Sequence, residues 1–217
     1  MLYYLNYIWW VPLTIINTIY FNLKFLPFRQ AIKFPVLVSG GVYFICSSGK
    51  VTIKNSSLFC VKLGFGGVNI FDKFNEKTII DISGEVDFDG KASIGQGCRI
   101  SVSGLLRFGK NFNITANSVI VSQYKVSFGD NVLISWGVLI MDTDFHKVST
   151  SSSIAAPVVI HNDVWICCRV LILKGVEVLD GTVVAANSSL VGTRYDGNSI
   201  VSCPSAKVIK NGISWTI

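Results

Sequence analysis

Hydrophobic residues recur every six positions along the chain from residue 82 onward. Each group of six begins with an aliphatic residue or phenylalanine, and most groups carry a small or β-branched residue four positions later. A helix cannot hold a period of six on one face, and an ordinary strand alternates with a period of two. The leading residues are Ile82, Phe88, Ile94, Ile100, Phe108, Ile114, Ile120, Phe128, Ile134, Ile140, Ile160, Ile166, Ile172, Val178, Val184 and Leu190.

This period predicts a triangular parallel β-helix, an all-β fold in which three faces of about six residues make one coil. Each leading residue then points inward and stacks on its equivalent one coil away, about 4.8 Å along the axis. The intervals 100–108 and 120–128 each hold two extra residues. The longer interval from 140 to 160 predicts a loop at 141–157. We expect the β-helix domain to span 36–200 and a C-terminal tail to span 201–217.

Residues 1–35 form a separate segment that is rich in aromatic residues. No charge occurs before Lys24, but Pro12 and Asn17 interrupt the run, and its tyrosines and tryptophans prefer a membrane boundary to a membrane core. The spacing predicts an amphipathic helix. That helix either lies in a membrane interface or packs its apolar face on the main domain or a partner subunit. The apolar face comprises Leu13, Ile16, Ile19, Tyr20 and Leu23.

Charge is sparse and unevenly placed. Charged residues make up 15% of the chain and the net charge is +6. Residues 1–80 carry eight Lys/Arg and two acids, which gives +6, and the remaining residues carry eleven of each. This pattern favours a membrane surface over nucleic acid as a partner. The sequence contains no basic cluster with interleaved aromatics, so no nucleic-acid partner is expected. The six cysteines have no metal-site spacing, so no metal is expected. Without a secretory signal, reduced thiols favour a cytoplasmic protein.

Three segments carry a family resemblance. They read FGDNVLI at 128–134, PVVIHNDVWI at 157–166 followed by ILKGV at 172–176, and CPSAKVIK at 203–210. These segments resemble the left-handed β-helix hexapeptide acyltransferases, in particular the galactoside and maltose acetyltransferases and the surface-polysaccharide O-acetyltransferases. The resemblance implies a left-handed coil, a homotrimer, and acetyl-CoA as co-substrate along the outer edge of the C-terminal coils, between subunits.

The chain has only two histidines, and one of them lies in the predicted loop. Acyl transfer to a hydroxyl needs a base, because a free alcohol is a poor nucleophile at neutral pH. The resemblance places the family's catalytic histidine at His146. Asp142 and Asp144 flank it, and they either orient the imidazole or are solvated loop acids. We interpret His161 as a residue of the outer surface.

The resemblance also implies five donor-site residues. Cys168 matches a small residue beside the thioester, and Ala186 matches one along the pantetheine. Trp165 would wall the pantetheine channel, and Lys207 and Lys210 would meet the phosphates. The alternatives are corner geometry for the two small residues, packing between coils for the tryptophan, and a solvated basic tail for the lysines.

These observations favour an acetyl-CoA-dependent O-acetyltransferase that acts on a sugar hydroxyl of a surface polysaccharide or its lipid-linked precursor. Such an enzyme would be cytoplasmic, with peripheral contact at the inner face of the membrane. The alternatives are an N-acetyltransferase acting on an amino sugar or nucleotide sugar, and a non-catalytic β-helix that binds carbohydrate or assembles. The absence of a G-x-G-x-x-G fingerprint disfavours a nucleotide-sugar domain.

Overall fold

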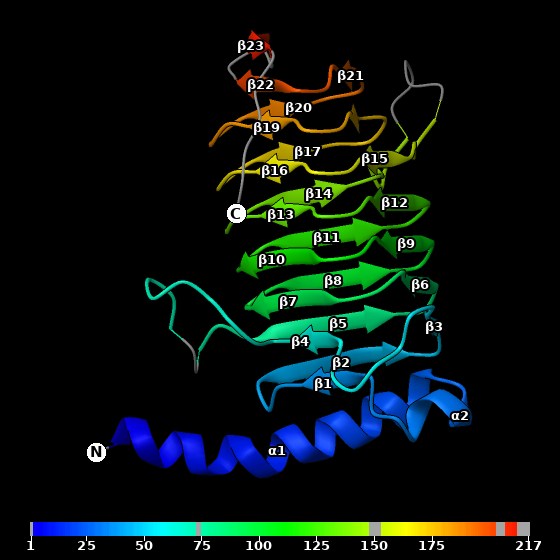
Figure 1. Cartoon of the computed structure of the whole chain (residues 1–217), viewed down its shortest axis with the longest axis vertical. Helices are drawn as coiled ribbons and strands as arrows, with labels where there is room; N and C mark the ends of the chain where they lie inside the picture. The colour runs from blue at the N-terminus through cyan, green and yellow to red at the C-terminus, as the bar shows by residue number, and fades with distance from the viewer. Residues whose placement is uncertain (1, 73–74, 148–152, 203–206, 212–217) are drawn as a thin grey trace.

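The computed structural model describes residues 2–72, 75–147, 153–202 and 207–211, with 2–9, 47 and 207–211 described by their backbone alone. Its coils wind through three sheets in turn, and a long helix lies across one end of the stack (Figure 1). We call the sheets A, B and C in the order in which each coil enters them. All strand pairs are parallel except the last pair of sheet A. The predicted parallel β-helix is therefore confirmed.

Each sheet takes every third strand. Sheet A contains β1 (Val36–Val38), β4 (Val61–Leu63), β7 (Ala92–Gln96), β10 (Phe112–Ala116), β13 (Leu133–Ile134), β16 (Trp165–Ile166), β19 (Val183–Val184), β22 (Ser199–Ser202) and the antiparallel β23 (Lys207–Asn211). Sheet B contains β2 (Val42–Ser47), β5 (Thr78–Ile82), β8 (Arg99–Val102), β11 (Val119–Ser122), β14 (Leu139–Met141), β17 (Leu171–Ile172) and β20 (Ser189–Leu190). Sheet C contains β3 (Lys50–Ile53), β6 (Glu85–Phe88), β9 (Leu105–Phe108), β12 (Lys125–Phe128), β15 (Val158–Ile160), β18 (Glu177–Val178) and β21 (Arg194–Tyr195).

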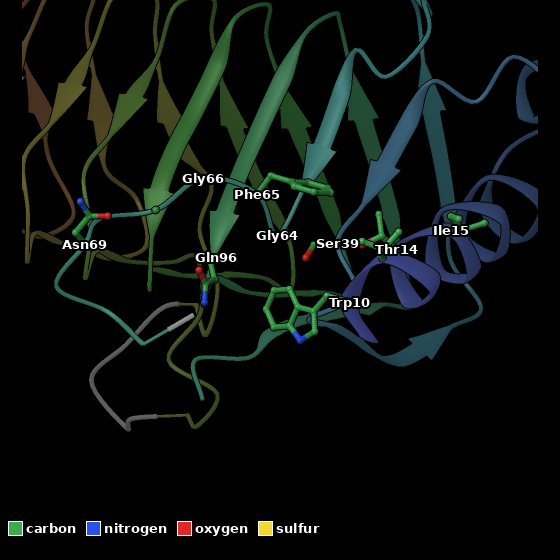
Figure 2. Close-up of a pocket in the computed structure, with 11 residues that line it drawn as sticks. Trp10, Thr14, Ile15, Ser39, Gly64, Phe65, Gly66, Asn69 and Gln96 are labelled. Carbon is green, nitrogen blue, oxygen red and sulfur yellow. The ribbon is translucent and has the colours of Figure 1, made fainter. Parts of the chain in front are cut away.

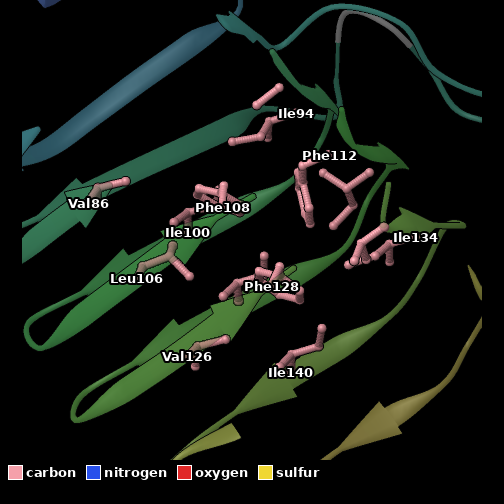
Figure 3. Packing of buried hydrophobic residues seen from close by; sticks show 14 of the residues in the cluster. Val86, Ile94, Ile100, Leu106, Phe108, Phe112, Val126, Phe128, Ile134 and Ile140 are labelled. Carbon is pink, nitrogen blue, oxygen red and sulfur yellow. The ribbon is translucent and has the colours of Figure 1, made fainter. Parts of the chain in front are cut away.

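The core is a set of stacked side chains along the axis. All sixteen leading residues of the repeat are buried. Phe108 lies between Phe88 and Phe128, with ring centroids 4.9 and 5.6 Å apart and rings nearly parallel. Figure 3 shows Phe108 and Phe128 within this core. Phe112 packs against this stack at a tilt, 4.5 Å from Phe108. Equivalent residues meet because parallel strands in register repeat the same side chain one coil higher.

The two extra residues of the repeat lie at the corner between sheets B and C. Ile100 stacks on Ile80 rather than on Ile82, so the predicted lead of that coil is displaced by two residues. The turn at Ser83 and Gly84 takes up the difference, as the next turn does at Ser103 and Gly104. A Cβ on Gly84 would lie 2.2 Å from the Gly104 carbonyl oxygen, so the stacked turns leave no room for a side chain there.

Helix α1 (Leu2–Phe25) covers the open end of the stack with two buried phenylalanines, Phe21 and Phe25, and with polar side chains. Asn22 both donates to the Val36 carbonyl oxygen (2.7 Å) and accepts from the Val36 N–H (3.2 Å). Thr18 makes the equivalent pair of hydrogen bonds with Val38 (3.3 and 3.0 Å). Asn17 Nδ2 donates to the Ser39 carbonyl oxygen at 3.0 Å. These side chains take the place of the neighbouring strand that β1 lacks at the edge of sheet A.

The predicted apolar face of α1 does not pack on the main domain, so that alternative is wrong. The five residues of this face are all exposed: Leu13, Ile16, Ile19, Tyr20 and Leu23. The side that meets the domain instead carries Asn17, Thr18 and Asn22, which bond to the unpaired backbone groups of the first coil. Phe21 and Phe25 lie on this side too and are buried in the core. A short second helix, α2 (Phe28–Ala31), links α1 to β1.

Candidate active site

The loop at 141–157 leaves the coil where β14 ends, at the corner between sheets B and C. In the coils below, both N–H groups of each turn donate to one carbonyl oxygen of the next coil: Ser103 and Gly104 donate to Ser122 (2.9 and 3.0 Å). The departing chain cannot repeat this arrangement. Instead the Asp142 carboxylate accepts from the backbone N–H groups of Gln123 and Tyr124, each at 2.8 Å.

Asp142 therefore anchors the loop. It is fully buried, so it is not a solvated loop acid. Ser122 Oγ lies 3.4 Å from the carboxylate as a third neighbour. The carboxylate faces the coil below, and its role in the structure is to satisfy backbone donors that the loop would otherwise leave unpaired.

The two arms of the loop are held together at their base. Thr143 and Ala155 form an antiparallel bridge, and the Ala156 N–H donates to the Asp142 carbonyl oxygen at 3.0 Å. Lys174 Nζ, from the corner one coil above, lies 2.6 Å from Asp144 Oδ2 and donates to the Ser153 carbonyl oxygen at 2.6 Å. One lysine thus connects both arms of the loop to the coil.

His146 lies just beyond this base and is exposed. The backbone N–H of His146 donates to the Asp144 carbonyl oxygen at 2.7 Å. Phe145 precedes it with a positive φ of 60° and donates from its N–H to Thr143 Oγ1 at 3.0 Å, which turns the chain sharply. Among the described residues the imidazole has no hydrogen-bond partner. Residues 148–152 of the predicted loop lie outside the described part.

The second histidine is part of a charged row on the surface of sheet C. His161 Nε2 lies 2.9 Å from Glu177 Oε1, and Arg194 lies 3.5 Å from the other oxygen of that carboxylate. This placement agrees with its interpretation as an outward-facing residue. It also makes His161 a natural comparison for His146.

Three of the predicted donor residues gather at the other edge of sheet B, the corner between sheets A and B. Cys168 and Ala186 follow β16 and β19 by two residues each, so they occupy the same corner of neighbouring coils. The Asn187 N–H donates to the Cys168 carbonyl oxygen at 3.1 Å and stacks the two turns. Trp165 lies on the outer side of sheet A, with Nε1 3.3 Å from Ser135 Oγ.

The predicted phosphate-binding lysines cannot be placed in the same way. The backbones of Lys207 and Lys210 belong to β23, where they pair with Ser202 and Ile200. Their side chains lie outside the described part of the structure, as do residues 203–206 of the tail motif. Their contact with a donor therefore stays a prediction.

One chain does not bring His146 and the donor corner together. Sheet B separates them: between Cys168 at one edge and Lys174 at the other lie six residue steps, or about 20 Å at roughly 3.3 Å per residue. His146 is attached to the Lys174 edge through Asp144. The two groups of predicted site residues thus lie at opposite edges of the same sheet.

The cysteines at the donor corner are poorly suited to nucleophilic chemistry. Partial burial raises the pKa of the Cys167 thiol, and the neighbouring Cys168 raises it further. A raised pKa keeps the thiol protonated at neutral pH, and the thiolate is the reactive form. Within the residues that the structure describes, no group of three or more His, Cys, Asp or Glu side chains could hold a metal ion.

Lys174 is the site residue that sequence reasoning missed. It lies inside the ILKGV segment at 172–176, where it appeared only as part of a motif. Its two contacts with the loop depend on the path of the loop at 141–157 relative to the next coil. The repeat period carries no information about that path. The one available signal was its position two residues after a leading isoleucine, at a corner.

A cavity of about 610 Å³ lies far from this loop, at the end of the stack covered by α1 (Figure 2). It opens between Trp10, Val11 and Ile15 of the helix and residues 64–67 after β4. Several coils separate it from His146, so it is not part of the candidate active site.

Comparison with known proteins gives two relatives in sequence. No family model matches the chain. It is similar to the galactoside O-acetyltransferase of Escherichia coli strain K12, with 36% identity over 87 residues, 38% of this chain and 43% of that protein. It is also similar to a probable acetyltransferase of Mycobacterium tuberculosis, with 31% identity over 119 residues, 52% of this chain and 39% of that protein. The matches span less than half the length of either relative. Both are named acetyltransferases, which confirms the resemblance over the matched part.

Solved structures show a more distant similarity. The polySia-specific acetyltransferase NeuO has a TM-score of 0.45 and 19% identity, over 82% of this chain and 89% of that chain. A galactoside acetyltransferase in complex with coenzyme A has a TM-score of 0.43 and 20% identity, over 90% and 78%. Similarity at this level identifies neither an activity nor a ligand for this chain.

Proposed function

We propose that this protein is an acetyl-CoA-dependent O-acetyltransferase whose acceptor is a sugar hydroxyl of a surface polysaccharide or of its lipid-linked precursor. One observation carries the proposal. A loop that leaves the coil is anchored at its base by Asp142 and Lys174 and presents an exposed histidine, His146. The sequence similarity to a galactoside O-acetyltransferase supports the reaction class.

In the proposed reaction His146 acts as general base. A ring nitrogen accepts the proton of the acceptor hydroxyl while the hydroxyl oxygen forms a bond to the carbonyl carbon of the thioester. The carbon–sulfur bond then breaks, and the leaving sulfur takes the proton from the imidazolium. A base of this kind contributes about 10²–10⁴-fold to the rate. Backbone N–H groups at a coil corner would stabilise the oxyanion.

We also propose that the active enzyme is a homotrimer in which each site is shared. His146 and the corner of Cys168 and Ala186 lie at opposite edges of sheet B, so a single copy cannot use both in one reaction. A cyclic assembly that packs the histidine edge of one protomer against the donor edge of its partner would join them. In that arrangement Trp165 would flank the pantetheine, and Lys207 and Lys210 would lie toward the phosphates.

The proposed location is the cytoplasm, at the inner face of the membrane, where a lipid-linked acceptor is available. The structure contributes one finding. Over the residues that it describes, no helix combines the length and the apolar character that a membrane span requires.

The test uses the two histidines as a matched pair. The full chain is incubated with acetyl-CoA and an acceptor panel of galactosides, polysialic acid and amino sugars, and free coenzyme A is measured by chromatography. We expect His146→Ala to lower kcat by about 10²–10⁴-fold, as removal of a general base does. His161→Ala should retain activity, because its ring pairs with Glu177 on the surface of sheet C.

The matched pair also defines failure. Equal activity of both variants would remove His146 from the mechanism. Transfer to amino sugars in place of hydroxyl acceptors would favour the N-acetyltransferase alternative.

A further inference from the structure

The outward side of α1 is an apolar surface at one end of the molecule. Its polar residues Asn17, Thr18 and Asn22 all face the first coil, where they bond to the backbone of β1 and its extension. The side that meets the domain also buries Phe21 and Phe25, yet the side that faces away carries exposed apolar residues, which a helix packed on a domain in water does not need. We call this surface the basal face. It comprises Leu13, Ile16, Ile19, Tyr20 and Leu23, all exposed.

Two large side chains on the basal face are more than half exposed: Ile16 is 59% exposed and Leu23 is 54% exposed. Phe28, in the short helix that follows, is 72% exposed. Scattered apolar residues on a surface are ordinary, but a contiguous apolar patch of this kind marks an interaction site. Figure 1 shows α1 lying crosswise under the stack, at one end of the molecule.

The whole net charge of the chain belongs to the same end. Residues 1–71 contain six Lys/Arg and no acid, and residues 72–217 contain thirteen of each, which leaves the net +6 in the first part. Lys24 near the end of α1, Arg29 in α2 and Lys33 just after it follow the basal face along the chain, and all three are exposed. An apolar helical face followed by lysine and arginine fits an anionic bilayer, where apolar burial and charge attraction act together.

We infer that the basal face docks on an anionic lipid bilayer, with α1 lying in the membrane interface and the β-helix projecting away from it. A second copy of the chain fits this face less well. Pairing two basal faces would bring two ends of charge +6 together, and like charges oppose such contact. The cavity shown in Figure 2 opens at the same end of the molecule, and Val11 and Ile15 of α1 line it, which adds apolar surface near the basal face.

The experiment is co-sedimentation of the full chain with vesicles of phosphatidylcholine, with and without phosphatidylglycerol. We expect binding to the anionic vesicles and weaker binding as salt rises. Ile16→Asp should weaken vesicle binding at least about tenfold, since it replaces an aliphatic side chain that the bilayer would bury by a negative charge. Val191→Asp is the matched control, because Val191 is also 59% exposed but lies in the last coils.

Several outcomes would overturn the inference. These are failure of the wild-type chain to bind anionic vesicles, or equal binding by Ile16→Asp and wild type. A change in oligomer mass caused by Ile16→Asp, without vesicle binding by the wild type, would assign the face to a second copy. Thermal unfolding of both variants checks that they fold. Acetyl transfer to a soluble acceptor, measured in the same samples, separates this inference from the proposed function because Ile16 lies far from His146.

Discussion

Asp142 and His146 belong to one loop but have different surroundings. The Asp142 carboxylate is buried and accepts two backbone N–H groups, whereas the His146 ring is exposed. Removing an acceptor from buried donors lowers the free energy of unfolding more than removing an exposed side chain does, because the buried donors lose their partners and gain no hydrogen bonds to water in exchange. Stability and activity should therefore respond differently at these two positions.

We expect Asp142→Asn to lower the free energy of unfolding by about 1–3 kcal/mol, since an amide can accept from only one of the two N–H groups well. His146→Ala should leave unfolding nearly unchanged. Urea denaturation of the three proteins measures both effects. Coincident midpoints for Asp142→Asn and wild type would contradict the anchoring role of Asp142.

At the scale of elements, the loop depends on a residue from a different coil. Lys174 reaches back from the turn after β17 to Asp144 and to the Ser153 carbonyl oxygen. Both groups are partly exposed, and ion pairs of this kind stabilise a fold little. The contacts instead restrict where the loop, and with it His146, lies relative to the sheet.

Lys174→Met should therefore lower kcat by about tenfold or more through misplacement of the base, while costing less than about 1 kcal/mol of stability. KM for acetyl-CoA should change much less than kcat, because both side-chain contacts of Lys174 are with the loop. Hydrogen exchange should quicken at the amides of Asp144 and His146. Lys174→Arg should restore part of the rate, and an unchanged rate in Lys174→Met would refute the positioning role.

How far the sequence predicts these elements depends on what each residue contacts. The leading residues of the repeat were predictable, because an inward position recurs in every coil and admits only apolar side chains. The lead of one coil is Ile80 and not the predicted Ile82, because the turn at Gly84 contains two extra residues that counting in sixes does not detect. The roles of Asp142 and Asn22 were not predictable, because each pairs with backbone groups left over where the regular coil begins or departs.

At the scale of the whole molecule, the candidate site is divided between two edges of one sheet. This division gives the proposed trimer a specific consequence. A variant damaged at one edge and a variant damaged at the other should repair one another when they assemble together. A site contained in one chain would show no such repair.

The test mixes His146→Ala with Ala186→Trp, a substitution at the exposed donor corner. Each alone should be inactive, the second because the bulky ring blocks the corner. After joint refolding in equal amounts, about one quarter of the interfaces in a cyclic assembly combine two intact edges. Activity near one quarter of wild type is expected, and no recovery would refute sharing of the site. Either variant refolded alone is the control.

The number of coils also determines how far the loop lies from the basal face along the axis of the β-helix. From β2 to β14 sheet B climbs four strand steps, which at about 4.8 Å each is roughly 19 Å. With the basal face on a bilayer, the loop would meet its acceptor at that elevation, beyond the headgroups and within reach of a saccharide extended from its lipid. Adding or deleting a complete coil would raise or lower the loop by one step while leaving every contact around His146 in place. The β-helix would then serve as a ruler that selects an acceptor by its distance from the membrane.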